Sequence, residues 1–520
     1  MVRDDEPGSA LTRRQLVERA GAAGLVLGLP AGALTAIPSA FGARSTNGTL
    51  RSQLDWGPTS TIDPQGPATA ANDVMRNSNV FERLLTADRS GKKLIGVLAR
   101  SIEPNKGANV WTLTLRRGIE WQDGTPFTAD DVVYSLKRIA NNKAMEGHAN
   151  LQMVKGTAIR KLSKYVVQVP LKYPYSDFPH QLADRMILMV KDGTTDFTKT
   201  LNGTGPFKYV SHNDREIVLE KNDNYWQPGL PKLNSIIGLN IPDPTAQLNA
   251  LKSRRVDLVP LLSPSNAALV KRDSRLKTVL SEAGSWSPIV MDTSKPPFNN
   301  KDVRMAIRLI ADRPAIRLAA QAGLGALGND LFGRLDPLYA SDLPQRKQDL
   351  ERAQFLLRRA GALDQTFTLE TGNVNQGAVE MCVALSQQAK KIGVKIVPKV
   401  NPSDSYWSAQ YMKAPFFVSG FANRSLMQQY LLVMYPGAPY NETQWRNGRT
   451  NKLFAQAMRT VNTGKRRQLL HDVQEILWQE GGYLIWGFQA NVAGALKTVK
   501  GLVPDANGPA MWYDWKTLSA

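Results

Sequence analysis

One segment constrains the fold more tightly than any other, because a strand, a turn and a capped helix follow one another without a break. Residues Trp111–Trp121, WTLTLRRGIEW, alternate apolar and polar side chains, as a half-buried strand does. Asp123-Gly124 predicts a tight turn, which glycine tolerates. Thr128, with Asp131 three residues later, forms a capping-box pattern, and apolar residues then recur at helical spacing. The segment predicts a strand–turn–helix unit with no evident catalytic group.

Helix-like and strand-like segments alternate along the rest of the chain. We expect strands at 164–171, 201–210 and 215–226, helices at 300–316, 349–362 and 466–482, and helices leading into strands at 243–259 and 378–400. Asp312 is placed to cap a second helix that has Pro314 in its first turn. Such alternation predicts an α/β fold with substantially parallel sheets.

The charge of the chain restricts the class of partner. The chain has 520 residues, enough for more than one domain, and a formal net charge of +20. This excess could attract nucleic acid, an anionic cell envelope or an anionic ligand. The basic residues are dispersed, which is typical of a solvated surface. No nucleic-acid-binding motif is recognisable, so we expect no nucleic-acid partner.

Cysteine and histidine are too few for a metal centre. The single cysteine, Cys382, lies in an apolar-patterned stretch and is expected to be a buried core residue rather than a nucleophile. The four histidines are scattered, with no metal-binding spacing. We therefore expect no metal site and no cofactor.

The first 43 residues have the features of an export signal. Arg13 and Arg14 precede a mildly apolar run interrupted by glycines and Pro30, and Thr12–Val17 resembles the twin-arginine signal. A membrane anchor is the alternative, but the apolar run is short for a span. We expect cleavage near Gly42 or Ala43. No cysteine follows the run, so no lipid anchor is expected there, and the protein should reside in the periplasm or on the outer cell surface.

Several segments together resemble a known family. In order along the chain, these segments are LIGVLARSIEPNKGANVWTLTLRRGIEWQDGTPFTADDVVYSLKRI (94–139), GTGPFKYV (203–210), LEKNDNYW (219–226), LNALKSRRVDL (248–258), PPFNNKDVRMAIRLIADRPAI (296–316) and EILWQEGGYLIWGF (475–488). They are similar to the extracellular solute-binding proteins of ATP-driven importers, family 5, the dipeptide, oligopeptide and nickel type. The resemblance covers nearly all of residues 50–520.

The resemblance implies a periplasmic-binding-protein-like fold of type II, with two hinged lobes and an inserted subdomain. By analogy the boundaries are 44–78, 201–290 and 488–520 for lobe I, 79–200 for the inserted subdomain, and 291–487 for lobe II. It implies a monomer that captures a peptide or another small organic solute between its lobes and delivers it to the permease subunits of an ABC transporter, without catalysis. Closure around the solute would be a hinge motion.

Two other functions remain open at this point. An exported sensor or chaperone could use the same scaffold, because a partner surface leaves no short motif. A hydrolase would need an activated nucleophile or paired carboxylates, and no G-x-S-x-G motif or metal-binding helix is present.

The resemblance also implies where the solute would bind. Position within the family pattern gives eight candidates: Trp56, Trp286, Phe421 and Arg424, with Tyr406, Trp407 and Asn441 on flanking loops and Trp486 near the return crossing. Aromatic rings give a pocket its area and its flat walls.

One candidate departs from the peptide-binding pattern. Many peptide binders of the family carry an acidic residue near this point that pairs with the peptide amino group, whereas Ser419–Ser425 contains none. Arg424 stands there instead, and its guanidinium suits a carboxylate or a phosphate. We therefore expect a solute that carries an anionic group held by Arg424, or that at least lacks the free amine which the missing acid would hold. A structural ion pair of Arg424 is the alternative. Nickel is disfavoured as a direct cargo because histidines are few.

Overall fold

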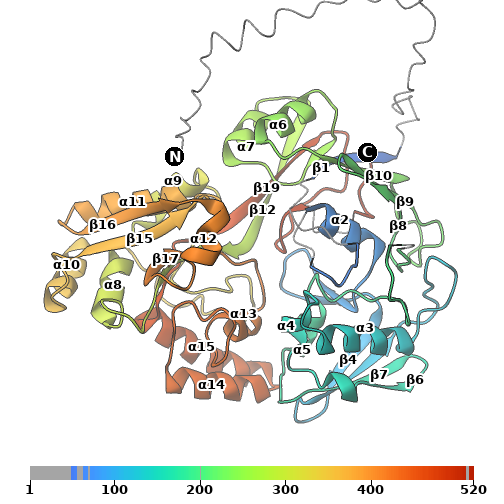
Figure 1. Ribbon diagram of the computed structural model, residues 1–520, viewed down its shortest axis with the longest axis horizontal. Coiled ribbons are helices and arrows are strands. Elements are labelled where there is room, and N and C mark those ends of the chain that lie inside the picture. The colour runs from blue at the N-terminus through green and yellow to red at the C-terminus, as the bar shows by residue number, and fades with distance from the viewer. Residues whose placement is uncertain (1–47, 55–61, 68–70, 199–200, 511–514) are drawn as a thin grey trace, which may run out of the picture. The chain divides into compact units, whose positions relative to one another are not determined.

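The computed structural model describes residues 48–54, 62–67, 71–198, 201–510 and 515–520 (Figure 1). The predicted export signal and Trp56 lie outside the described residues. Residues Asn47–Ala520 form one compact unit. Among the described helices, none is long and apolar enough to cross a membrane.

The largest sheet has eight strands and is mixed in direction. Its order is β12 (Leu276–Trp286), β19 (Gly487–Leu496), β11 (Leu258–Val259), β1 (Thr49–Leu54), β10 (Ser235–Asn240), β9 (Glu216–Lys221) and β8 (Phe207–His212), with β14 (Ala326–Leu327) also paired to β19. Strand β1 runs parallel to β10 and β11, and the other printed pairs of this sheet are antiparallel. Three helices accompany this sheet: α2 (Ala71–Val80), α6 (Pro244–Lys252) and α7 (Pro264–Lys271).

The strand–turn–helix segment predicted from the sequence belongs to a second, four-stranded antiparallel sheet. Its order is β4 (Ala99–Pro104), β5 (Val110–Leu115), β7 (Val166–Pro170) and β6 (Arg160–Ser163), beside the hairpin β2 (Leu85–Ala87) and β3 (Leu94–Gly96). Helix α3 (Ala129–Asn141) lies along this sheet (Figure 1). Its predicted capping box is confirmed, since the Thr128 backbone N–H donates to Asp131 Oδ2 at 2.7 Å. The remaining elements are α4 (His148–Leu151), the short helix η1 (Gly156–Ala158) and α5 (Phe178–Leu182).

A third, five-stranded sheet carries most of the remaining helices. Its order is β16 (Lys395–Asn401), β15 (Thr366–Gly372), β17 (Phe416–Val418), β13 (Ile289–Met291) and β18 (Tyr483–Leu484). The helices of this region are α8 (Lys301–Ile310), α9 (Arg313–Gln321), α10 (Leu350–Arg359), α11 (Ala378–Lys390), α12 (Ser403–Ala409), α13 (Leu426–Val433), α14 (Gly448–Arg459) and α15 (Thr463–Glu480). Cys382 is fully buried in their core, as predicted.

Two short connections join the eight-stranded sheet to the five-stranded sheet. Ser287-Pro288 leads from β12 to β13, and Ile485-Trp486 leads from β18 back to β19. The second connection is held by the segment after β14, because the Gly328 N–H donates to the Trp486 carbonyl at 2.9 Å. The chain also enters the eight-stranded sheet at β14, which pairs with β19 and lies in sequence between β13 and β15 of the five-stranded sheet.

The predicted elements are largely present, but the predicted parallel sheets are wrong in part. Helix α9 begins after its Asp312 cap, and Pro314 lies in its first turn. The parallel pairs are β1 with β10 and β11, and β15 with β16 and β17. The other pairs among the described strands are antiparallel, because neighbours in sequence, such as β4 with β5 and β8 with β9, pair as hairpins without a helical crossover.

Candidate functional site

A cavity of about 330 Å³ is enclosed by segments that are far apart in the sequence. Its wall comes from the β2–β3 hairpin region (83–95), from α5 and the residues after it (180–185), from 336–337 and 422–428 around the start of α13, and from the described residues 505–507 and 516–517 of the C-terminal segment. Two of these regions meet the hairpin closely: the Asn507 side chain donates to the Asp88 carbonyl at 2.8 Å, and a Cβ at Gly91 would lie 3.7 Å from Asn423 Nδ2.

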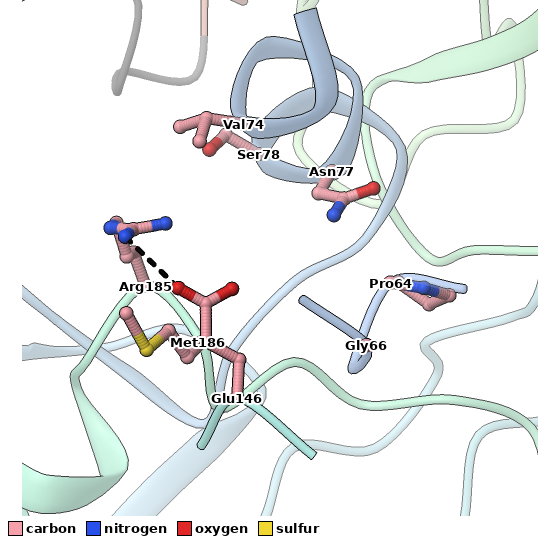
Figure 2. Close-up of a pocket in the computed structure, with 8 residues that line it drawn as sticks. All are labelled: Pro64, Gly66, Val74, Asn77, Ser78, Glu146, Arg185 and Met186. Atoms are coloured by element: carbon pink, nitrogen blue, oxygen red, sulfur yellow. Dashed lines mark hydrogen bonds and ion pairs between the residues drawn. The ribbon is translucent and has the colours of Figure 1, made fainter. Parts of the chain in front are cut away.

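Two other hollows are less suited to enclose a solute. One, of about 10 Å³, lies beside α2, and Figure 2 shows it between Ser78 and the ion pair of Arg185 with Glu146. That volume is about one water molecule, although Arg185 also lines the larger cavity. The other, of about 480 Å³, is lined only by residues between Met412 and Asn451. The cavity of about 330 Å³ is therefore the candidate site, because several separate parts of the fold converge on it.

Most of the charged groups in the cavity wall are held by other protein groups. The cationic side chains are Arg83, Arg89, Arg185, Arg424 and Lys516. Arg89 donates to Thr517 Oγ1 at 3.1 Å, Arg185 pairs with Glu146 at 3.3 Å, and Lys516 lies 3.2 Å from the Tyr225 hydroxyl. Within the described residues, Arg424 has no hydrogen bond and no ion pair. The alternative in which Arg424 is a structural ion pair therefore has no support in this conformation.

The backbone beside Arg424 is fixed although its guanidinium is free. Ser425 caps α13, and its hydroxyl donates to Asp177 Oδ2 at 2.6 Å. The Leu426 N–H donates to Asp336 Oδ2 at 2.7 Å. Two separate carboxylates thus hold the first residues of α13, and they place the preceding residue, Arg424, in the cavity wall.

The structure brings two predicted aromatic residues together next to this wall. Trp286 is fully buried and stacks on Phe421 with ring centroids 4.9 Å apart, while its backbone bonds to that of Phe421 in both directions. Phe332 also stacks on the Trp286 indole, with ring centroids 5.4 Å apart. Phe421 directly precedes the cavity residues Ala422–Ser425. Trp286 and Phe421 support the wall from behind, and Trp286 offers no exposed surface in this conformation.

The other predicted aromatic and amide residues lie away from this cavity. Tyr406 is fully buried and its hydroxyl donates to the Val418 carbonyl at 2.8 Å. Trp486 is fully buried in the connection to β19, and Trp407 is 43% exposed. Asn441 lines the hollow of about 480 Å³. The structure does not bring these four residues to the cavity, and their contact with a solute stays a prediction.

Sequence reasoning missed several parts of the wall. The β2–β3 hairpin, α5 and the C-terminal segment contribute cavity residues that include His180, Asp184 and Lys516. Helix α5 has five residues, and the C-terminal segment has no regular secondary structure beside the cavity, so neither gives a periodic signal. Contacts between residues far apart in the sequence, such as those of 88–89 with 506–507, hold the hairpin and the C-terminal segment together.

No group of three or more His, Cys, Asp or Glu residues that could hold a metal ion occurs in the described part of the chain. The burial of Cys382 raises the pKa of its thiol to about 12, which keeps it protonated at neutral pH. The candidate site is accordingly a cavity with charged walls, suited to holding a solute by hydrogen bonds and ion pairs.

Comparisons with known proteins agree with this description. Residues 93–441, more than half of the chain, match the family described as bacterial extracellular solute-binding proteins, family 5. Over 475 residues the chain is 26% identical to the glutathione-binding protein GsiB of Escherichia coli O6:K15:H31, covering 86% of this chain and 90% of that protein.

Solved structures share the fold at low identity. NikZ from Campylobacter jejuni, in complex with Ni(L-His), matches with a TM-score of 0.77 and 19% identity, covering 91% of this chain and 100% of that one. AgaA from A. tumefaciens R10, in complex with agropinic acid, matches with a TM-score of 0.72 and 22% identity, covering 90% and 97%. These likenesses show a shared fold, and the molecules named belong to those proteins.

Proposed function

The chain belongs to the bacterial extracellular solute-binding proteins of family 5, and we propose that it binds a small anionic organic solute in the cavity beside Arg424. The family consists of binding proteins of ABC transporters, not of enzymes. Its members work outside the cytoplasm. The proposal therefore concerns which solute is taken up and which residues hold it.

The observation that carries the proposal is the free guanidinium of Arg424. An arginine in a cavity wall presents a planar fork of donors that matches a carboxylate or a phosphate. Within the described residues nothing else in the protein occupies that fork. A bound anion would give it a partner.

The names of the relatives suggest a concrete first candidate. GsiB is named for glutathione, a short peptide with two carboxylates, and AgaA was crystallised with an organic acid. A peptide-like acid of this size suits a cavity of about 330 Å³. The absence of acid in Ser419–Ser425 agrees with a solute whose recognition depends more on its carboxylate than on its amino group.

A binding experiment tests the role of Arg424. We expect reduced glutathione, used as the probe in isothermal titration, to bind the wild-type protein, and Arg424→Ala to weaken binding about tenfold to a hundredfold. Arg424→Lys keeps the charge and loses the fork, so it should fall between the two. Arg446→Ala, an exposed arginine outside the cavity, is the control.

Two results would contradict the proposal. Equal affinity of wild-type protein and Arg424→Ala for glutathione would remove Arg424 from the site. If glutathione does not bind, a panel of short peptides, organic acids and phosphorylated compounds is titrated in the same way. Binding of only cationic or uncharged members of that panel would contradict an anionic solute.

We further propose that binding is coupled to closure of two lobes about the two connections. The proposed lobe I comprises 44–78, 201–290 and 488–520, the inserted subdomain 79–200, and lobe II 291–487. Strand β13 already pairs within the five-stranded sheet from Ile289, which favours Ser287-Pro288 and Ile485-Trp486 as the hinge. Short connections can absorb the backbone rotation while each sheet moves as a rigid body.

Export and assembly complete the proposal. Arg13 and Arg14 would direct the folded chain through the twin-arginine route, and the protein would act as a monomer that passes its solute to permease subunits. Replacing both arginines by lysine should leave the protein in the cytoplasm, which cell fractionation measures. Export at the wild-type level would contradict this route and leave solute binding unaffected.

A further inference from the structure

The segments α5 and α13 make a polar contact across the cavity wall, although nearly 250 residues separate them. Ser425 Oγ donates to Asp177 Oδ2 at 2.6 Å. The Gln428 side chain donates to the His180 carbonyl at 3.1 Å and to Gln181 Oε1 at 3.2 Å. We name these groups, Asp177, His180, Gln181, Ser425 and Gln428, the α5–α13 contact. Three of them, His180, Ser425 and Gln428, also line the cavity.

Charged groups from three regions meet at this contact. The His180 Nδ1 atom lies 2.7 Å from Asp177 Oδ1, on its own segment. Asp336 lies in the loop before α10. Within the described residues it forms no ion pair, and its carboxylate accepts the N–H of Leu426 at the start of α13. Arg466, from α15, donates to the Ser176 carbonyl at 3.4 Å. Two carboxylates therefore face one arginine and one histidine.

The protonation of His180 decides whether these charges balance. With a neutral imidazole, two carboxylates face a single permanent cation, and like charges at short range repel. Burial disfavours the charged imidazole, but Asp177 and Asp336 outweigh it and raise the pKa of His180. Burial and Asp177 likewise raise the pKa of Asp336. Both shifts favour an additional proton on His180 or Asp336, whereas Asp177 stays ionised, because His180 lowers the pKa of Asp177 against the effect of burial.

We propose that the α5–α13 contact is a proton-dependent closure of the solute cavity, in which protonated His180 allows Asp177 and Asp336 to lie together when the two lobes meet. This inference rests on the proposed function, because it gives a regulation of the same cavity. Opening would separate Asp177 from Ser425 and Asp336, and it would remove the repulsion. Asp177 and His180 are thus positioning residues, which hold the start of α13 and with it Arg424.

The direction of the pH dependence follows from the sign of the shift. Asp177 is on the same segment as His180 and stays beside it in either form, so closure adds only the carboxylate of Asp336, which raises the pKa of His180 further. A histidine whose pKa is higher in the closed form favours closure below its ordinary pKa, and this contribution is lost as the pH rises through the raised value. Mild acid should therefore close the protein and retain solute, whereas mild alkali should open it and release solute.

Single-molecule fluorescence transfer without any solute tests the closure directly. Dyes on Thr157→Cys and Gln456→Cys, both exposed, report the separation of the η1 region from α14. The buried Cys382 would not take label. We expect the closed-to-open ratio to fall about tenfold between about pH 6 and about pH 8.5. In His180→Gln most of this pH dependence should be lost.

Two further variants are needed: a control at another histidine and a second substitution within the α5–α13 contact. His471 also pairs with an aspartate, Asp342 at 2.9 Å, but outside the α5–α13 contact, so His471→Gln should keep the wild-type pH profile. Ser425→Ala should lower the closed-to-open ratio about tenfold at every pH. Circular dichroism melting confirms that each variant is folded before it is compared.

The results separate this inference from the proposed function. A pH profile in His180→Gln equal to that of the wild type, or an unchanged ratio in Ser425→Ala, would overturn the proton-dependent closure, whatever solute binds. Failure of glutathione to bind, with the fluorescence results as expected, would instead overturn only the proposed solute. Measuring glutathione affinity at both pH values then links the two, with tighter binding expected at the lower pH.

Discussion

Asp330 and Glu442 are both buried carboxylates in the region of the five-stranded sheet, and they are stabilised in opposite ways. Asp330 accepts two hydrogen bonds from Arg313, at 2.7 and 2.8 Å, and one from Arg346 at 2.7 Å. Glu442 accepts from the Ser419 hydroxyl and from the Tyr483 hydroxyl, the latter at 3.1 Å. In the described part of the chain Glu442 has no ion-pair partner.

The two environments set opposite protonation states. Burial by itself would raise the pKa of Asp330, but the charges of Arg313, Arg346 and Arg308 lower it below the ordinary value. Burial also dominates at Glu442, and its hydroxyl donors offset this only in part, so its pKa is raised to about 7. A buried carboxylate in this fold is thus permanently charged beside arginine and titratable beside hydroxyls.

Several arginines surround the single carboxylate of Asp330, and the carbonyl groups at the end of a helix stabilise the arginines that do not pair with it. Arg308 donates to the carbonyls of Trp478 and Gln479, and Arg304 donates to the carbonyl of Glu480, all in the last turn of α15. The C-terminal end of a helix carries a partial negative charge and unsatisfied carbonyls. Asp330 also accepts the Ile485 N–H at 3.2 Å, so this charged cluster is attached to the proposed hinge.

The largest effect should come from removing the charge of Asp330. We expect Asp330→Asn to lower the free energy of unfolding by about 3 to 5 kcal/mol, because Arg313 and Arg346 would remain buried without a counter-ion. Chemical denaturation monitored by circular dichroism measures it. Asp342→Asn, at an aspartate 72% exposed, should change stability by less than about 1 kcal/mol. Similar small losses in both variants would contradict the role given to the arginines.

A smaller effect is expected at Glu442, where the charged form of the carboxylate destabilises the folded protein. Its pKa rises from an ordinary 4.5 to about 7 on folding, so the folded protein binds more protons between these values. The free energy of unfolding should therefore fall as the pH rises from about 4.5 to about 7, by about 3 kcal/mol in all. Glu442→Gln does not titrate, so its stability relative to the wild type should increase with pH.

Melting temperatures at about pH 5 and about pH 8 measure this effect. The control is Glu475→Gln, because Glu475 is exposed on α15 and should leave the pH dependence unchanged. If Glu442→Gln and the wild type lose stability in parallel as the pH rises, Glu442 is ionised in the folded protein and the contrast with Asp330 disappears.

The comparison also shows what the sequence can and cannot predict. Helix caps and turns depend on neighbouring residues, so the capping box of Thr128, the Asp312 cap and the buried position of Cys382 were predictable. The strand directions were not, because periodicity is the same in parallel and antiparallel strands. The arginine cluster was also not predictable, since Arg313 and Asp330 belong to different elements and look like ordinary surface residues in the sequence.

The same distinction between local and long-range features applies to the candidate site. The family pattern placed Arg424 and Phe421 near the wall of the cavity, since both lie in one local stretch before α13. It did not place His180 or Lys516 there, because their position depends on packing between distant segments. It also assigned Tyr406 and Trp486 to the site, although an aromatic side chain in the core has the same sequence signature as one in a pocket.

The smallest effect should come from Asp131, a third buried carboxylate, whose nearest partners are backbone N–H groups. Thr128 and Asp192 donate to it at 2.7 and 2.9 Å. Burial is the main cause that raises its pKa, and these donors lower it only in part. The Asp131→Asn variant has an uncharged side chain of the same shape with one acceptor oxygen fewer. We therefore expect the free energy of unfolding to fall by about 1 kcal/mol. Its exposed neighbour is the control, because Asp130→Asn removes an exposed ion pair with Lys161 and an exposed charge in the first turn of α3, and it should cost about half as much or less. Denaturant titration of both variants measures the difference. A loss at Asp131 as large as that at Asp330 would mean that backbone donors hold a buried charge as firmly as arginines do, and the contrast between permanent and titratable carboxylates would then need another cause.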